Sequence, residues 1–197
     1  MGPLKIWTIG HGTRPVEELA SMLGGPGVGL LIDVRAHPGS RRHPQFNRDV
    51  LENSLRTHGI AYRWEGKALG GFRRPRPDSR NTGLRNDAFR GYADYMDSEE
   101  FAAGADRLIE RARETRLAVM CAERHPSRCH RRLISDWLAS REIEVEHLID
   151  TRRSEPHVLT KQAVVEAGRL AYPGMASRAS NSDRVAALTS SPRRLSG

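Results

Sequence analysis

The sequence predicts a single α/β domain built on a mainly parallel sheet of about five strands, with helices on both faces. Short runs that are apolar throughout follow one another along the chain, separated by segments of helical periodicity. Uninterrupted apolar runs are typical of strands buried on both faces. The length of 197 residues fits one domain of ordinary size plus a tail.

Five segments carry the strand pattern and five carry the helical pattern. The expected strands are residues 5–10, 30–36, 60–65, 117–123 and 145–150. The expected helices are residues 14–23, 47–59, 87–96, 98–115 and 129–141. Thr13 and Pro15 mark the start of the first helix, whereas Asn47 opens and Gly59 closes the second. A long polar loop, residues 66–83, follows the third strand.

The charge is distributed unevenly between a domain and a tail. Residues 1–174 are expected to form the domain, and residues 175–197 a disordered basic tail of small and polar residues. The net charge is +8, and the eight basic and three acidic residues from Thr151 onward supply +5 of it. Most of the basicity is therefore no evidence for a nucleic-acid groove in the domain.

Composition also limits where the protein acts. No segment approaches the roughly 20 apolar residues of a membrane span. The first residues, MGPLKIWTIGHG, lack the pattern of a signal peptide, and two cysteines make no disulfide framework. We therefore expect a cytoplasmic protein without membrane association.

Charged and reactive side chains follow the expected strands at the point where each strand ends. These residues are His11, Asp33, Arg35, Glu65, Cys121, Glu123, His147 and Asp150. Because ligands bind beyond the carboxyl ends of parallel strands, this gathering predicts a functional site at one edge of the sheet.

Several positions near this edge allow both functional and structural interpretations. His11 stands between two glycines, which permit close approach of a ligand, but it could also be a turn histidine exposed to water. Asp33 and Arg35 point to the same side of their strand, so they could share an anion or simply form a pair that holds the sheet end. Ser40 and Arg41 could grip a phosphate or belong to a solvated loop.

The stretch VMCAERHPSRCHRRLI, residues 119–134, holds both cysteines of the chain. Cys121 is expected at the tip of a central strand and Cys129 at the head of the next helix, where unpaired N–H groups favour a phosphate or a thiolate. The layout is analogous to the cysteine–arginine loops of phosphatases and rhodaneses. Cys121 and Arg128 are further apart than in those loops, so the likeness is one of layout only.

Three interpretations of the cysteines stay open: a reactive thiol, a metal site, or an inert place in the fold. Cys121 has the position of a nucleophile and equally that of a small buried residue at a strand end. Cys129 is either a helix-start thiolate or an inert helix residue. A metal site would need His11 or His125 to complete its ligands, and we expect no bound metal or other cofactor.

Six motifs stand in a fixed order over residues 6–173. They are TIGHGTRPVEEL, LIDVRAHPGSRRHPQFN, LGG, YADYM, VMCAERHPSRCHRRLI and LTKQAVVEAGRLAYP. In this order they resemble the DUF488 family, bacterial and archaeal proteins of unknown function. The resemblance implies an α/β domain with a site built from His11, Asp33, Arg35, Ser40, Arg41, Cys121, Glu123, Cys129, His130 and Arg131. Gly12 replaces the serine that is usual in that family, so any role of that hydroxyl is absent here.

The preferred hypothesis is a small enzyme that acts on a phosphate-bearing substrate, a nucleotide or a nucleic-acid end. The catalytic residues would be His11, Asp33, Cys121 and Glu123, with His11 or Glu123 as general acid or base and Cys121 as nucleophile or substrate contact. The anion would be bound by Arg35, Ser40, Arg41, Arg128, Cys129, His130 and Arg131.

Two alternatives belong to other classes. One is a non-catalytic nucleic-acid-binding or regulatory module that uses the arginines of residues 35–48 and 73–80 together with the basic tail. The other is a thiol redox or metal site at the two cysteines.

Overall fold

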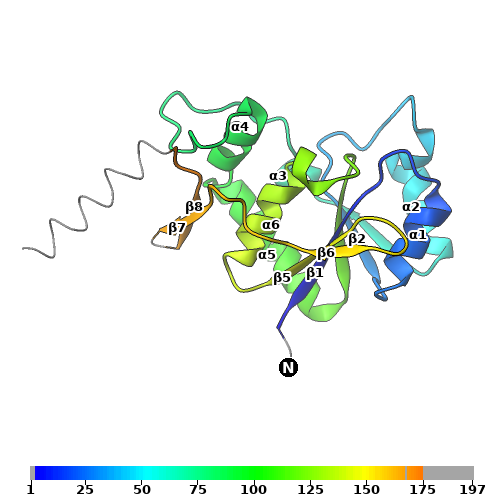
Figure 1. Cartoon of the computed structure of the whole chain (residues 1–197). Coiled ribbons are helices and arrows are strands. Elements are labelled where there is room, and N and C mark those ends of the chain that lie inside the picture. The colour runs from blue at the N-terminus through cyan, green and yellow to red at the C-terminus, as the bar shows by residue number, and fades with distance from the viewer. Residues whose placement is uncertain (1–2, 167, 175–197) are drawn as a thin grey trace, which may run out of the picture.

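The protein, represented by a computed structural model that describes residues 3–166 and 168–174, is a six-stranded sheet with helices on both faces (Figure 1). This confirms the expected fold class, a mainly parallel sheet between two layers of helices. The expected basic tail, residues 175–197, lies outside the described residues. Within the described part, no helix is long and apolar enough to cross a membrane.

The elements have the following bounds. The main sheet contains β1 (Lys5–Gly10), β2 (Leu30–Asp33), β3 (Ala61–Trp64), β4 (Leu117–Cys121), β5 (Glu144–Leu148) and β6 (Ser154–Pro156). The α-helices are α1 (Val16–Gly24), α2 (Arg48–Thr57), α3 (Gly66–Leu69), α4 (Asp87–Tyr95), α5 (Glu99–Glu114) and α6 (Arg131–Ala139). Two short 3₁₀ helices, η1 (Pro44–Phe46) and η2 (Pro126–Arg128), and a hairpin of β7 (Val164–Glu166) and β8 (Arg169–Ala171) complete the set.

The order of the strands brings three carboxyl ends together. The sheet runs β3-β2-β4-β1-β5-β6, with β1 to β5 parallel and β6 antiparallel to β5 at one margin. Gly10 at the end of β1 lies beside Cys121 at the end of β4, and Asp33 at the end of β2 lies beside Met120. The residues that follow β1, β2 and β4 therefore meet at one edge of the sheet.

Alternation along the strands divides the core into two layers. Leu31 and Met120 face α1 and α2, whereas Ile32, Val119 and Cys121 face the layer of α3 to α6. Successive side chains of a strand point to opposite faces, so the apolar runs fill both layers at once. This explains why these strands are apolar throughout rather than at every second residue.

The helix after β4 begins later than expected. The sequence predicts its start at Cys129, but α6 begins at Arg131. Pro126 starts the 3₁₀ turn η2, and Cys129 then has an extended backbone, with φ of −134° and ψ of 146°. The segment between the 3₁₀ turn and the helix is therefore a loop, and Cys129 lies outside the helix. The edge strand β6 and the hairpin β7–β8 also lack a counterpart in the predicted elements.

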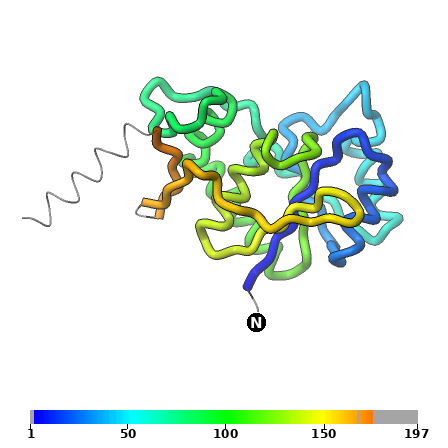
Figure 2. Tube along the Cα trace, in the orientation of Figure 1, coloured from blue at the N-terminus to red at the C-terminus, as the bar shows by residue number. Residues whose placement is uncertain are grey.

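The segment after β5 returns to the helical layer and is anchored there by one carboxylate. The hairpin β7–β8 lies on the side of the molecule that holds α4, α5 and α6 (Figure 2). Asp136 of α6 is fully buried; its Oδ1 accepts from Thr160 N and His157 Nε2, and its Oδ2 accepts from Thr160 Oγ1 and Tyr172 OH. One aspartate thus holds three residues of the returning segment.

The same carboxylate ends a chain of hydrogen bonds that crosses the sheet. His157 Nε2 donates to Asp136, and His157 Nδ1 forms a hydrogen bond with His147 Nε2 over 2.9 Å. His147 Nδ1 in turn forms a hydrogen bond with Thr8 Oγ1 of β1 over 2.7 Å. Burial first, and then the neighbouring His157, lower the pKa of His147 to about 3, so the imidazole of His147 is neutral at neutral pH.

Replacement of Asp136 by Asn is expected to destabilise the fold by about 2–4 kcal/mol, because an amide nitrogen cannot accept two of these bonds. Urea unfolding monitored by circular dichroism measures the change, with Asp106→Asn on the exposed side of α5 as the matched control. Equal stability of Asp136→Asn and Asp106→Asn would contradict this assignment.

Candidate active site at the carboxyl edge of the sheet

The floor of the site forms where the turn after β1 packs against the loop after β4. His11 N donates to Cys121 O over 3.0 Å, and Gly12 N donates to Ala122 O over 2.9 Å. A side chain at Gly10 would collide with the carbonyl oxygen of Glu123, so only glycine permits this approach. Gly12 has φ of +54°, which also favours glycine. The two glycines around His11 therefore serve close packing of two loops.

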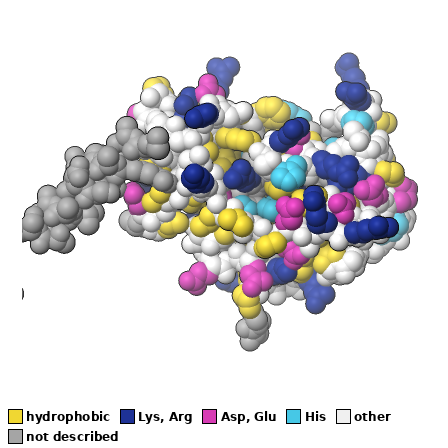
Figure 3. All heavy atoms as spheres, in the orientation of Figure 1, with side chains coloured by type: hydrophobic (Ala, Val, Ile, Leu, Met, Phe, Trp, Pro, Cys, Tyr) yellow, Lys and Arg dark blue, Asp and Glu magenta, His cyan; other side chains and the backbone are white. Residues whose placement is uncertain are grey.

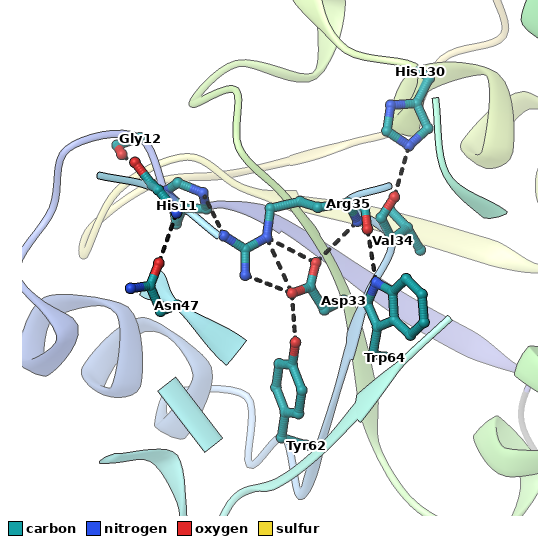
Figure 4. Close-up of polar contacts among 10 residues, drawn as sticks. His11, Gly12, Asp33, Val34, Arg35, Asn47, Tyr62, Trp64 and His130 are labelled. Carbon is teal, nitrogen blue, oxygen red and sulfur yellow. Dashed lines mark hydrogen bonds and ion pairs between the residues drawn. The ribbon is translucent and has the colours of Figure 1, made fainter. Parts of the chain in front are cut away.

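A buried ion pair at the end of β2 fixes the central arginine of the site (Figure 4). Arg35 donates through Nε to both carboxylate oxygens of Asp33 and through Nη2 to Oδ2 over 2.6 Å. The hydroxyl of Tyr62 on β3 donates to the same Oδ2 over 2.6 Å. Burial and then the charge of Asp33 raise the pKa of Tyr62, so this phenol stays protonated and remains a donor.

His11 is a neutral imidazole that holds the other side of the guanidinium. Its Nδ1 lies 2.9 Å from the carbonyl oxygen of Gly12, which can only accept, so Nδ1 carries the proton. Nε2 is then free to accept from Nη1 of Arg35 over 3.3 Å. The ring stacks on Phe46 with centroids 4.1 Å apart. Burial first, and then the charge of Arg35, lower the pKa of His11 to about 4.

These residues border a cleft with two compartments, one on each side of the sheet edge. The polar compartment, about 470 Å³, is lined by His11, Gly12, Thr13, Arg35, His37, Gly39, Ser40, His43, Ala122, Glu123 and Arg124. The apolar compartment, about 420 Å³, is lined by Arg35, Ala36, His37, Gly71, Phe72, Ala88, Phe89, Cys121, Ala122, Glu123, Arg128, Cys129 and His130. Arg35, His37, Ala122 and Glu123 line both, so the two compartments adjoin.

An exposed aromatic side chain stands at the apolar compartment. Phe72 leaves 87% of its surface exposed, and its backbone adopts φ of 64°. Its ring lies 6.1 Å from that of His37, and Phe89 of α4 lines the same compartment. Phe72 and Phe89 therefore give the apolar compartment two aromatic side chains.

The structure brings most of the predicted site residues to this cleft. His11, Arg35, Ser40, Cys121, Glu123, Arg128, Cys129 and His130 all line one compartment or both. Asp33 and Arg131 are buried beneath the lining, with Asp33 fully enclosed. Arg41 is exposed and is not among the lining residues of either compartment.

Two other strand ends do not contribute to the cleft. Glu65, after β3, is bonded by Arg107 over 2.8 Å and Arg111 over 2.6 Å, and these ion pairs lower its pKa although burial opposes them. His147 of β5 belongs to the buried chain that ends at Asp136. The expected convergence of strand ends therefore holds for β1, β2 and β4 only.

Three aromatic residues at or beneath the cleft were not predicted from the sequence. Tyr62 contacts Asp33 from 29 positions away, and Phe46 reaches His11 from the 3₁₀ helix η1. Phe72 lies in a polar loop, where its neighbours gave no pattern. Only Phe72 had a weak signal, because an aromatic residue amid glycines and arginines is unusual for a solvated loop.

The histidine beside Cys129 is engaged within the fold. Across residues 3–166 and 168–174, no three His, Cys, Asp or Glu side chains gather as a set that could hold a metal ion. His130 Nε2 instead lies 3.2 Å from the carbonyl oxygen of Val34, to which it donates, and its ring packs on Tyr92 with centroids 4.9 Å apart. Burial is the main reason that the pKa of His130 is lowered to about 4.

The fold and the cleft define an α/β protein with an open, mainly parallel sheet and a cleft at the carboxyl edge of β1, β2 and β4. The family model described as domain of unknown function DUF488 matches residues 15–138, and the chain belongs to this family. No curated protein and no solved structure matches the chain. His11 and the anchoring residues Thr160 and Tyr172 lie outside the matched residues.

The stability of the protein is expected to fall as the pH decreases from about 6.5 to about 4. In this window the unfolded chain protonates His11 and the folded chain does not, so the unfolded state binds more protons. The free energy of unfolding should fall by up to about 1.4 kcal/mol per pH unit for this residue. Urea titrations at several pH values measure the slope. His11→Gln should make the slope shallower, with the buried His130 and His147 still contributing to it, whereas His58→Gln at an exposed position should leave it unchanged; equal slopes for both variants would refute the assignment.

Proposed function

We propose that the cleft binds a phosphate-bearing substrate of the nucleotide class, either a free nucleotide or a nucleic-acid end, and that the protein is a small enzyme acting on it. The observation that carries this proposal is that a basic, polar compartment and an apolar compartment with an aromatic wall adjoin at one edge of the sheet. A nucleotide has the same division into phosphate and base.

The polar compartment has the donors that a phosphate needs. Arg35 is already held by Asp33 and His11, so its remaining N–H groups face the cleft without the entropy cost of ordering a free side chain. Ser40 is fixed by its neighbours: its N–H donates to Asn47 Oδ1 and its Oγ accepts from His43 N. Its hydroxyl proton is left for a ligand, and the exposed Arg124 adds a second charge.

The apolar compartment suits a planar base. Phe72, Phe89 and His37 supply aromatic faces, and stacking on an aromatic side chain contributes about 1–3 kcal/mol per base. Arg128 at the same compartment could stack on a base or contact a second phosphate. Stacking of this kind tolerates every base, which fits a site whose lining has few groups for base-specific hydrogen bonds.

The reacting groups would lie where the compartments join. Glu123 is exposed, lines both compartments and is the candidate general acid or base. Cys121 lines the apolar compartment and is the candidate nucleophile or substrate contact. Asp33 and His11 act through Arg35 and are positioning residues in this proposal.

A non-catalytic nucleic-acid-binding module is supported less well. Arg76 and Arg80 pair with Asp97, and Arg73 lies 3.7 Å from the ring centroid of Tyr95, so most arginines of the 73–80 loop are engaged within the protein. The face in Figure 3 carries Lys and Arg side chains interspersed with acidic groups rather than one continuous basic surface. Such a face attracts the phosphate backbone weakly.

Replacement of Arg35 by Lys should weaken binding of a nucleoside monophosphate about 10- to 100-fold, because a lysine cannot keep both Asp33 and a phosphate in the same fork. Isothermal titration calorimetry against a panel of nucleotides measures the change. Arg63→Lys, an exposed substitution on β3 outside the cleft, is the matched control. Unchanged affinity in Arg35→Lys, or no binding of any nucleotide to the wild type, would overturn the proposed site.

Replacement of Phe72 by Ala should lower nucleotide affinity by about 1–3 kcal/mol while leaving the binding of inorganic phosphate unchanged. The side chain is exposed, so the fold should tolerate the change. Competition by inorganic phosphate against a fluorescent nucleotide separates the two effects. Val158→Ala, another exposed apolar position, is the control. An equal loss for phosphate and nucleotide would show that Phe72 does not contact the base.

A further inference from the structure

An arginine without an acidic partner is buried beneath the apolar compartment. Arg131, the first residue of α6, leaves only 1% of its surface exposed. Its Nη2 donates to the carbonyl oxygen of Arg124 over 3.2 Å, but Nε and Nη1 have no hydrogen-bond partner. No carboxylate of the described residues forms an ion pair with it. A buried charge in this state is costly, so a nearby group that can become negative is stabilised.

The groups beside this charge are the two thiols of the chain. Cys121 and Cys129 are both reduced, both buried and both part of the lining of the apolar compartment. The backbone N–H of Arg131 points at Cys129 Sγ over 3.4 Å. Both thiols line this one compartment from the two ends of the loop that joins β4 to α6.

The arrangement makes the two thiols unequal. Burial alone would raise the pKa of Cys121, but the hydrogen bond from Cys129 and the charge of Arg131 outweigh it, and the pKa of Cys121 is lowered. Burial and the neighbouring Cys121 raise the pKa of Cys129. Cys121 therefore ionises more readily, whereas Cys129 stays protonated and can donate its proton. Reactive dithiols divide their roles in the same way.

We propose that Cys121 and Cys129 form a dithiol site that reduces hydroperoxides and closes to a disulfide, with Arg131 as the charge that activates Cys121. The inference does not rest on the nucleotide proposal, because its evidence is two buried thiols that line one compartment beside an unpaired guanidinium.

The chemistry balances with a hydroperoxide as the oxidant. The Cys121 thiolate attacks the terminal oxygen; an S–O bond forms, the O–O bond breaks, and the departing alkoxide takes up the proton that Cys121 released. Cys129 then attacks the sulfenic sulfur; an S–S bond forms and the hydroxyl leaves as water with the proton of Cys129. Two thiols are oxidised by two electrons, and the hydroperoxide is reduced to an alcohol and water.

His130 is placed to assist the second step. Its Nε2 donates to the carbonyl oxygen of Val34, which leaves Nδ1 unprotonated and 3.5 Å from Cys129 Sγ. A neutral imidazole at this position can accept the proton of Cys129 as that thiol attacks. The surroundings of Cys129 thus supply a base for the step in which it must become nucleophilic.

The test is oxidation of the reduced full-length chain with hydrogen peroxide, followed by maleimide blocking and intact mass. The wild type should become about 2 Da lighter, lose both titratable thiols and regain them with dithiothreitol. The chain has two cysteines, so an intramolecular disulfide can have no other partners. Cys129→Ser should stop at a sulfenic acid on Cys121 that dimedone traps, and Cys121→Ser should give no sulfenic acid.

The role of Arg131 has its own measurement. Arg131→Met should slow the reaction of Cys121 with peroxide at pH 7 about tenfold for each unit by which its pKa rises, whereas Arg132→Met on the next residue should not. If Arg131→Met does not fold, the pH dependence of iodoacetamide labelling in Cys129→Ser tests the same point, with half-maximal labelling expected below the ordinary thiol pKa of about 8.5.

Three results would overturn the proposal. The first is two thiols that remain free after peroxide treatment. The second is oxidation of Cys121 to a sulfinic acid while Cys129 stays reduced, which would show that Cys129 cannot reach it. The third is disulfide formation only between two chains. None of these results bears on nucleotide binding, which is measured separately.

Discussion

The cleft depends on the hydrogen-bonded ion pair between Asp33 and Arg35. The end of β2 is buried, so a guanidinium there needs a full set of partners, and Asp33 supplies two oxygens from two positions away on the same side of the chain. Breaking such a pair costs about 3–5 kcal/mol. With Tyr62 behind the carboxylate and His11 against the guanidinium, the positive charge is held at the point where both compartments open.

The two compartments follow from the alternation of side chains at the sheet edge. Asp33 and Met120 point to the face of α1 and α2, where His11 stacks on Phe46, whereas Cys121 points to the face of α3 to α6. Neighbouring strands therefore deliver charged groups to one side of the edge and thiols to the other. One cleft acquires two chemical environments because the sheet has two faces.

Two buried arginines have opposite electrostatic surroundings. The charge of Arg35 is balanced by the carboxylate of Asp33, and the role that we propose for Arg35 is ligand binding. Arg131 has no carboxylate, and the groups beside it are thiols whose charge depends on conditions. The charge of an arginine paired with an aspartate is compensated by that carboxylate. The charge of an arginine beside a thiol is compensated only when the thiol is ionised, so the free-energy cost of burying that arginine depends on the protonation state of the thiol.

The sequence by itself determined the parallel sheet, its two helical layers and the edge at which His11, Arg35 and Cys121 gather. Those features follow from local periodicity and from the rule that residues after parallel strands meet at one edge. Tertiary structure alone decided that Glu65 and His147 turn away to other partners, that Tyr62 and Phe46 support the site, and that Arg131 is buried without a carboxylate. Each of these features depends on contacts between residues far apart in the chain, and a local sequence pattern does not predict such contacts.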